Sequence, residues 1–567
     1  MDTHGSTSGD AGAYGDGPGS GPPVPPNGPG AEAGSGPPPY QGQDQDQDQG
    51  QHQDQRQDQG AGHRQDAAGP AVGLGISQRM YLPAGAGAQD LHAILTVHVD
   101  GIDEAAATGA AAGADGPPLA EVLVVDCSVS MNVPEKKIHA ARQAAVTALK
   151  ALPDGTPFAI VKGTHHAVTV YPPSGPMRPA SAATRAEAAL AVYAMQAGGG
   201  TCVGNWLDLA GTLLAEQSAP IPHVLMLTDG RNEHDDRNPL AAVLDTWQGR
   251  FLCDAWGIGK DWDAQVLVDV TTRLHGSADA VHDESELPSA YAALVERLLA
   301  KPLPELEIRV TPSPGSRLRY LRQMFPNELI LPQTATETAT GAAVAFTTRA
   351  WGNEVRRYQL CLTVDPEGRA LDEDLQAAVV EVVAPGSRFR PAGGHPPGPG
   401  ELRLPPAKPC RVRWTDDPVP ALTGNEEDEH FEKHRRLGDT AGRAAEAFRV
   451  GQREAAVRLL GIAVMLAHEL NAHRQLAELQ RIVEIRDPAN GNVVLREGVT
   501  RDAFEHLITA STHTTHGPTS DGLPGGDLQV RPVAGLVGCP KCRAPIPSNA
   551  KFCPHCRHRL TPRVEAP

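Results

Sequence analysis

Between residues 118 and 302, short apolar runs alternate with segments whose apolar residues recur at helical spacing. Parallel strands that are buried on both faces are typically near-continuous in apolar character. Three of the runs have this character: EVLVVD (121–126), HVLMLTD (223–229) and FLCDAWGIG (251–259). Because strand-like and helical segments repeat in turn, the pattern predicts a doubly wound α/β domain over residues 118–302.

The segments on either side of this domain carry a strand pattern of a different kind. In DLHAILTVHVD, alternate apolar residues share one face of a strand: Ala93, Leu95, Val97 and Val99. Residues 303–416 contain several short apolar or β-branched runs separated by glycine and proline, which predicts a β-sandwich. We expect residues 76–117 to join this sandwich, so that the α/β domain is inserted within it.

The rest of the chain divides into one helical region and segments of biased composition. Residues 424–512 have apolar residues at helical spacing, which predicts two or three packed helices. Residues 1–75 are rich in Gly, Pro, Gln and Asp and offer almost nothing to bury, so we expect a disordered tail. A linker over residues 513–537 leads to a cysteine-containing segment at 538–561.

The composition indicates the cellular compartment and the class of partner. The chain has 567 residues, a net charge of -18 and nine cysteines. This acidic balance argues against a general nucleic-acid-binding protein. The first residues lack the basic and apolar regions of a signal peptide, and no apolar run is long enough to span a bilayer. Five cysteines are scattered, which suits reduced thiols better than disulfides. We therefore expect a soluble cytoplasmic protein without a membrane partner.

Five side chains with oxygen donors follow strands or precede a helix of the α/β domain. Asp126, Ser128 and Ser130 end and follow EVLVVD, Asp229 ends HVLMLTD, and Thr201 precedes a helical pattern. Ligands bind at the carboxyl edge of parallel strands, and these hard donors suit Mg²⁺ or Mn²⁺ rather than zinc. Since Mg²⁺ takes about six ligands, water or the carboxylate of a protein partner must complete the set. Alternatively, the same residues cap helices without a metal.

The motifs DCSVSM, GGGT and TDG, in this order on alternating strands and loops, resemble the metal-ion-dependent adhesion site of the von Willebrand factor A (vWA) domain. The resemblance covers about a third of the chain. It implies that Ser128, Ser130 and Thr201 bind the metal directly. It further implies that Asp126 and Asp229 act directly or through water.

Four cysteines near the C-terminus have the spacing of metal ligands. Cys539 and Cys542 form one CxxC pair, and Cys553 and Cys556 form the other. Four thiolates at this spacing bind structural Zn²⁺ tetrahedrally, and the segment resembles a zinc ribbon. From Arg531 to the C-terminus, seven Lys or Arg residues stand against one Glu. The ribbon could contact nucleic acid or an acidic protein, and a protein is favoured because no aromatic stacking set accompanies the charge.

The enzyme motifs that we sought are incomplete or missing in the sequence. HELNAH places His468 and His473 five positions apart, not at the i, i+4 spacing of zinc proteases. We find no P-loop, nucleophile elbow or kinase signature. The leading prediction is a non-enzymatic, metal-dependent protein-binding scaffold. Bacterial intracellular proteins that pair a vWA domain with a C-terminal cysteine module are similar in organisation. Some of them belong to tellurite-resistance and phosphorylation-signalling clusters, which implies a stress or signalling assembly.

Two other functions stay open. A metal-dependent hydrolase would use the same five oxygens, with Glu233 or His234 as the general base. An adaptor would work with a separate AAA+ ATPase, as some vWA proteins do. The loop RNEHDD (231–236) is either a solvated polar loop, which we favour, or it places Glu233, Asp235 or Asp236 near the metal.

Overall fold

The computed structural model of the protein describes the chain in several ranges: 70–102, 119–132, 136–301, 303–338, 341–366, 370–385, 402–517, 536–538, 541 and 545–547. Most of the segment expected to be a disordered tail lies outside these residues. So do the four cysteines of the expected zinc ribbon: Cys539, Cys542, Cys553 and Cys556. Among the described residues, no helix combines the length and the apolar character needed to cross a bilayer.

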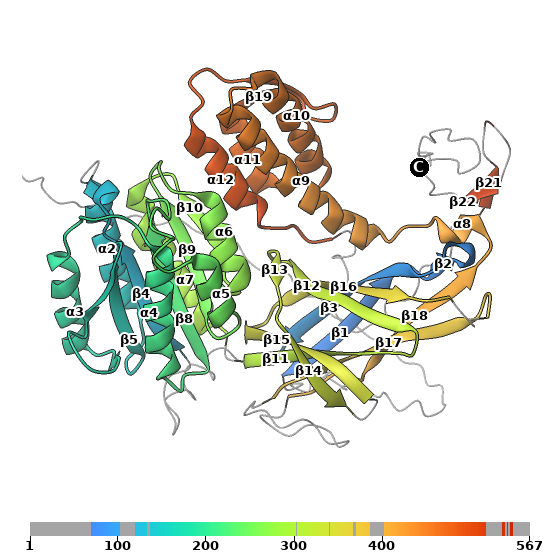
Figure 1. Cartoon of the computed structure of the whole chain (residues 1–567), viewed down its shortest axis with the longest axis horizontal. Helices are drawn as coiled ribbons and strands as arrows, with labels where there is room; N and C mark the ends of the chain where they lie inside the picture. The colour runs from blue at the N-terminus through green and yellow to red at the C-terminus, as the bar shows by residue number, and fades with distance from the viewer. Residues whose placement is uncertain are drawn as a thin grey trace, which may run out of the picture. The chain divides into compact units, whose positions relative to one another are not determined.

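A seven-stranded sheet forms the centre of the α/β domain (Figure 1). Its order is β10–β9–β8–β4–β5–β6, and β7 pairs with β5. Neighbours from β10 to β5 are parallel, whereas β6 and β7 run antiparallel to β5. Every residue of β4 and β9 is buried, as the apolar runs predict. The strands are β4 (Leu119–Asp126), β5 (Pro157–Gly163), β6 (Ala167–Tyr171), β7 (Arg178–Pro179), β8 (Ile221–Thr228), β9 (Leu252–Ile258) and β10 (Ala278–Val281).

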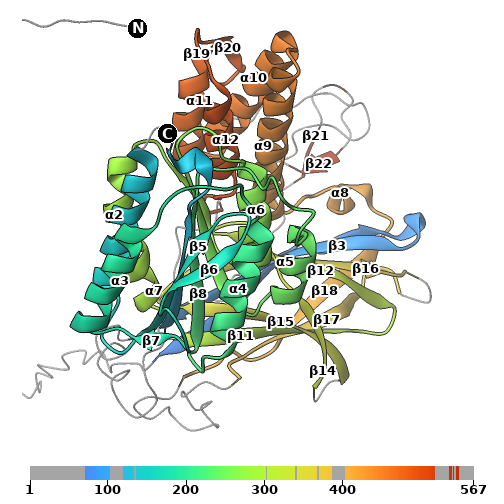
Figure 2. The ribbon, with the colours of Figure 1, turned by 60° about the vertical axis from the view of Figure 1, so that its left-hand side comes forward.

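Helices cover both faces of this sheet, because successive residues of a strand point to opposite sides. Leu123 and Val125 of β4 pack into one core with α2, α3 and α7. Val122 and Val124 pack into another core with α4, α5 and α6, which lie on one face of the sheet in Figure 2. The prediction of a doubly wound α/β domain is therefore confirmed. The helices are α2 (Lys136–Ala151), α3 (Ala182–Ala194), α4 (Val203–Ala215), α5 (Leu240–Trp247), α6 (Ala264–Arg273) and α7 (Leu287–Leu299), with the 3-10 turns η2 (Val129–Asn132) and η3 (Glu284–Glu286).

Two further sheets are built from the segments before and after the α/β domain. The five-stranded sheet has the order β1–β3–β16–β12–β13, and the six-stranded sheet has the order β14–β15–β11–β17–β18–β2. In the first, the strands are β1 (Ala71–Gln78), β3 (Gln89–Asp100), β12 (Ser316–Phe325), β13 (Leu329–Ile330) and β16 (Val355–Val364). In the second, they are β2 (Tyr81–Pro83), β11 (Leu303–Pro312), β14 (Gln333–Thr338), β15 (Gly341–Trp351), β17 (Asp374–Val383) and β18 (Lys408–Thr415), and the 3-10 turn η1 (Ala84–Ala86) follows β2.

The two sheets share one hydrophobic core, to which side chains of both contribute. β3 pairs with β16 along the whole length of β16, although the α/β domain separates the two strands in sequence. β1 starts at Ala71, so the expected boundary of the disordered tail at residue 75 is wrong. Val72 and Leu74 are buried in the shared core and pair with β3. Because of the glycines in AVGLGIS, the sequence pattern did not predict the start of this strand.

A helical region follows the two sheets and has its own core. Asn425 caps α9 by accepting hydrogen bonds from the backbone N–H groups of Glu427 and Asp428. An antiparallel hairpin, β19–β20, interrupts the helices of this segment, which the sequence pattern predicted to be mostly helical. The elements are α8 (Pro418–Ala421), α9 (Glu426–Arg449), α10 (Arg453–Glu469), α11 (His473–Ile482), β19 (Val483–Asp487), β20 (Asn492–Leu495) and α12 (Arg501–Ser511), and the paired strands β21 (Leu536–Gly538) and β22 (Pro545–Pro547) come later in the chain.

Candidate metal centre in the vWA-like α/β domain

The five oxygen donors expected to bind metal lie at the carboxyl edge of the central sheet. β4 and β8 are parallel neighbours, so their carboxyl ends meet at the same edge. Asp126 is the last residue of β4, and Asp229 directly follows β8. The turn η2 after β4 contains Ser130, and Ser128 lies just before it. Thr201 lies two residues before α4.

Hydrogen bonds of side chains and of one backbone N–H join four of these residues into one network. Asp126 Oδ1 accepts from the backbone N–H of Ser128 at 2.7 Å, and Asp126 Oδ2 accepts from the Thr228 hydroxyl at 2.6 Å. The hydroxyl oxygens of Ser128 and Ser130 are 2.9 Å apart. The Ser130 hydroxyl donates to Asp229 Oδ1 at 2.7 Å. Residues from two different strand ends are thereby held within one cluster.

The absence of a side chain at Gly230 leaves space among the donor oxygens. A Cβ added there would lie 2.9 Å from Thr201 Oγ1, 3.4 Å from Asp126 Oδ2 and 3.6 Å from Ser128 Oγ. Three donor oxygens from two separate segments, the end of β4 and the loop before α4, therefore surround one point. A cradle of hydroxyl and carboxylate oxygens of this kind fits Mg²⁺ or Mn²⁺.

Burial raises the free-energy cost of carboxylate charge at this edge of the sheet. Asp126 and Asp229 are fully buried. Burial raises the pKa of Asp126 to about 6, although its hydrogen bonds from Ser128 and Thr228 act in the opposite direction. Burial also raises the pKa of Asp229 and outweighs the opposing effect of Lys137. Since a buried carboxylate without compensating charge costs free energy, a cation at this point would be stabilised.

Lys137, which the sequence analysis did not single out, lies inside the cluster. It is 3% exposed, and its Nζ donates to Asp229 Oδ2 at 2.7 Å and to Asp261 Oδ2 at 3.3 Å. Burial lowers its pKa, but the hydrogen bonds and charges of the two aspartates outweigh burial, so the pKa of Lys137 is raised. Gly259 leaves room for the side chain of Lys137, since a Cβ there would lie 2.7 Å from Lys137 Cε. The ammonium group of Lys137 therefore neutralises the charge of Asp229. It does not neutralise the charge of Asp126.

Two histidines border the loop that carries Thr201. The ring of His165 lies against Gly199 and accepts a hydrogen bond from the backbone N–H of Gly200 at 3.3 Å. The ring of His234 lies against Gly200, with its centroid 5.8 Å from that of His165. The two rings therefore pack against the glycines that precede Thr201.

The acidic residues of the loop 231–236 have different environments. The carboxylate of Asp235 accepts hydrogen bonds from the Asn232 side chain and from the backbone N–H of Leu240, so it holds the loop together. Glu233 and Asp236 are exposed. Among the described residues, neither forms a hydrogen bond or an ion pair with the five donors.

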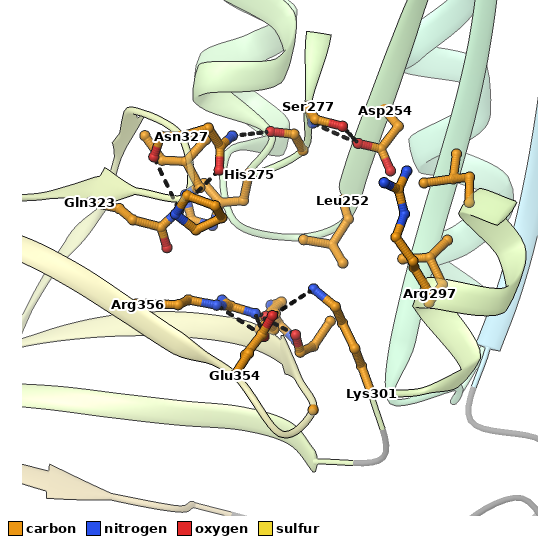
Figure 3. Close-up of a pocket in the computed structure, with 18 of the residues that line it drawn as sticks. Leu252, Asp254, His275, Ser277, Arg297, Lys301, Gln323, Asn327, Glu354 and Arg356 are labelled. Atoms are coloured by element: carbon orange, nitrogen blue, oxygen red, sulfur yellow. Dashed lines mark hydrogen bonds and ion pairs between the residues drawn. The ribbon is translucent and has the colours of Figure 1, made fainter. Parts of the chain in front are cut away.

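A cavity of about 490 Å³ lies around the start of β9 (Figure 3). None of the five donors is among the residues that line it. Most of its charged side chains are already paired. Glu354 binds both Lys301, at 3.2 Å, and Arg356. Asp254 accepts from Ser277 and from His223. The cavity therefore offers less uncompensated charge than the sheet edge, and the sheet edge is the stronger candidate site.

Comparisons with known proteins identify the α/β domain. Residues 121–280 match the sequence model of the family described as von Willebrand factor type A domain. The solved structure of a von Willebrand factor type A protein from Catenulispora acidiphila is 27% identical, with a TM-score of 0.66, and the similarity covers 80% of this chain and 99% of that chain. These findings confirm a vWA domain, and the structural similarity extends beyond it.

A relative from Synechocystis sp., which carries the name of an uncharacterised protein, is 24% identical over 221 residues. The match covers 38% of this chain and 50% of that protein, so this chain spans about half the length of the relative. A vWA domain favours a role in protein interaction or a metal-dependent scaffold in general terms. The finer assignment depends on the metal centre.

Proposed function

We propose that the protein is a non-enzymatic scaffold that binds a protein partner through Mg²⁺ or Mn²⁺ at the vWA domain. Asp126, Ser128, Ser130, Thr201 and Asp229 would hold the ion. The observation that carries the proposal is the space at Gly230, which three of these donors surround at 2.9–3.6 Å from the missing Cβ. When bound, the metal supplies an electrophilic centre for one more oxygen ligand.

The chemistry of the donors supports a ligand from outside the chain. Mg²⁺ takes about six oxygen ligands, and the five side chains include only two carboxylates. Lys137 already balances one of them. Val129, between two of the donors, is 62% exposed and offers an apolar contact beside the site. A partner that presents an acidic residue next to an apolar surface would fit both features.

The C-terminal cysteines provide the second part of the proposal. Cys539, Cys542, Cys553 and Cys556 would bind Zn²⁺ and form a ribbon that makes a second contact with a protein partner. The five remaining cysteines are free and buried: Cys127, Cys202, Cys253, Cys361 and Cys410. Free thiols of this kind support a reducing compartment, and we place the protein in the cytoplasm.

Mn²⁺ titration followed by electron paramagnetic resonance tests the metal centre. Asp126→Ala and Asp229→Ala should each abolish tight Mn²⁺ binding in the full chain. Asp236→Ala is the matched control, because it removes the same charge from an exposed position on the neighbouring loop. If the two site variants bind Mn²⁺ as the wild type does, the metal centre is refuted.

The partner is tested separately, with the tagged full chain as bait. Proteins retained in Mg²⁺ and released by EDTA are identified by mass spectrometry. The proposal expects the same proteins to be missing from the Asp126→Ala bait and present on the Asp236→Ala bait. If the same proteins are retained in EDTA and on the Asp126→Ala bait, the contact does not depend on metal and the proposal is contradicted.

A second candidate function is a metal-dependent hydrolase, which one observation favours. The Nδ1 atom of His234 is buried and has no hydrogen-bond partner within the described part of the chain, and its ring lies beside Gly200. An imidazole near a metal can act as a general base. If the protein hydrolyses phosphoesters of a test panel only with metal, and His234→Ala abolishes this activity, the protein is an enzyme and the scaffold proposal is wrong.

A further inference from the structure

The vWA domain and the helical region meet along a seam at β10 and α6. Asp279 of β10 forms an ion pair with Arg474 of α11. The backbone N–H of Ala264, at the start of α6, donates to Glu505 of α12 at 3.0 Å. His513 binds the carbonyl of Ala278 at 3.2 Å. The seam is therefore specific, with polar contacts along its length.

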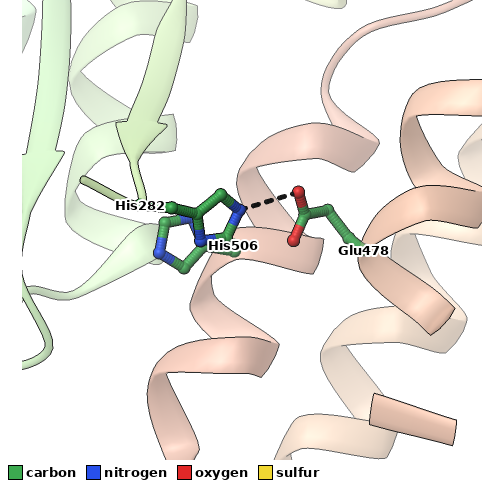
Figure 4. A group of neighbouring side chains, drawn as sticks. All are labelled: His282, Glu478 and His506. Atoms are coloured by element: carbon green, nitrogen blue, oxygen red, sulfur yellow. Dashed lines mark hydrogen bonds and ion pairs between the residues drawn. The ribbon is translucent and has the colours of Figure 1, made fainter. Parts of the chain in front are cut away.

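Three side chains with metal-binding atoms meet at this seam (Figure 4). His282 follows β10, Glu478 belongs to α11 and His506 belongs to α12. One potential ligand atom from each lies within 4.8 Å of the other two. His282 Nε2 is 3.0 Å from Glu478 Oε1, and the two imidazole rings stack with centroids 3.8 Å apart.

The cluster contains one buried polar atom that has no hydrogen bond, beside a buried imidazole. His506 is only 6% exposed, and its ring contacts Trp262 and His282 without a side-chain hydrogen bond in the described ranges. The Oε2 atom of Glu478 is buried and has no hydrogen-bond partner there either. Arg481 approaches this oxygen only to 3.6 Å. Buried polar atoms without partners are costly, so the cluster is suited to a ligand that they would share.

We propose that His282, Glu478 and His506 bind one Zn²⁺ ion that joins the vWA domain to the helical region. Two imidazole nitrogens and one carboxylate oxygen form a donor set that zinc prefers, with water in the fourth position. This site differs from the all-oxygen centre at the sheet edge, and it does not depend on that centre.

The geometry requires one adjustment. Tetrahedral zinc with bond lengths of about 2.0–2.1 Å places its ligand atoms roughly 3.3 Å apart. The His282 and Glu478 atoms, 3.0 Å apart, are close to this separation. The stacked rings lie at 21° to each other, so one ring must turn to direct its nitrogen at the shared point. His282 is the more exposed of the two rings, so we assign the turn to it.

The zinc content of the full chain tests the site. The wild type and its variants are loaded with Zn²⁺ in excess Mg²⁺, which keeps the all-oxygen centre out of the measurement. After exhaustive dialysis, zinc is measured by mass spectrometry. His282→Ala and Glu478→Ala should each lose about one equivalent relative to the wild type. His468→Ala, an exposed histidine of α10, is the matched control and should lose none.

A second measurement separates metal binding from the direct ion pair between His282 and Glu478. Zn²⁺ should raise the melting temperature of the wild type and of His468→Ala more than that of the two site variants. Unchanged zinc content in either site variant would overturn the three-ligand assignment. The four cysteines of the proposed ribbon are present in all the variants, so zinc bound there does not change the comparison. The all-oxygen centre is tested separately, by Mn²⁺ binding to Asp126→Ala. Failure of the zinc proposal therefore leaves the proposed function intact, and failure of the proposed function leaves the zinc proposal intact.

Discussion

Replacing His223 with glutamine is expected to destabilise the vWA domain, because His223 lies between two buried carboxylates. Its Nδ1 is 2.8 Å from Glu121 Oε2, and its Nε2 is 3.1 Å from Asp254 Oδ2. His223 and Glu121 are inaccessible to solvent, and Asp254 is 6% exposed. The three residues come from the neighbouring strands β4, β8 and β9. Loss of the imidazolium would leave two acidic groups without their cation.

The size of the effect follows from the pKa of the histidine. Burial alone would lower the pKa of His223, but the charges and hydrogen bonds of Glu121 and Asp254 raise it from 6.5 to about 10. At about 1.4 kcal/mol for each pH unit of difference, this corresponds to roughly 5 kcal/mol. Burial nevertheless raises the pKa of Glu121, so part of the attraction offsets desolvation. Breaking a buried pair typically costs about 3–5 kcal/mol, and we expect this loss for His223→Gln near neutral pH.

The sign of the pH dependence provides the sharper test. Because the pKa of His223 is raised on folding, its contribution is fully present below about pH 6.5 and is lost as the pH rises through about 10. Urea unfolding of the wild type, His223→Gln and the exposed-site control His468→Gln should be followed from pH 6 to 10.5. The difference between the wild type and His223→Gln should shrink at alkaline pH, while His468→Gln follows the wild type. A constant difference across this range, or one below about 1 kcal/mol, would refute the reasoning.

Three further predictions concern the metal centre. Gly230→Ala should weaken Mn²⁺ binding at least about tenfold, because its Cβ would lie 2.9 Å from Thr201 Oγ1; Gly442→Ala, with open space around it, should bind normally. Lys137→Met should tighten Mn²⁺ binding by about tenfold in a titration, since it removes a competing cation; unchanged or weaker binding would contradict this role. Mg²⁺ at about a hundredfold excess over its Kd should stabilise the wild type by about 2.7 kcal/mol in calorimetry, and the Asp126→Ala variant should show no such gain.

The sequence was informative where local patterns determine structure. The buried parallel strands appear as apolar runs, and the ends of those runs locate Asp126 and Asp229. The geometry of the sheet then requires both residues to lie at one edge. The α/β domain and the proximity of its five oxygen donors could therefore be predicted without a structure. Whether these donors bind a metal stays a prediction.

Other features depend on contacts that a local pattern does not contain. Lys137 resembles a solvated residue at the start of a helix, and its partner Asp229 lies 92 positions later. The hairpin β19–β20 was missed because short helices surround it, although the sequence DPANGN is rich in turn residues. His282 and Glu478 are 196 positions apart. Only the packing of the helical region against β10 brings them together.

β4 carries two fully buried acidic residues, and the different environments of these residues explain why only one end of the strand is suited to bind a metal. Glu121 has a cation from the protein itself, because His223 lies opposite it on β8. Asp126 accepts hydrogen bonds from uncharged donors only, and no ion pair of Asp126 is present within the described residues. Lys137 is directed to Asp229 instead. A buried carboxylate in this situation either takes up a proton, consistent with its pKa of about 6, or binds a cation from solution. Because the open space at Gly230 lies beside Asp126, the second outcome gives this edge of the sheet its proposed function.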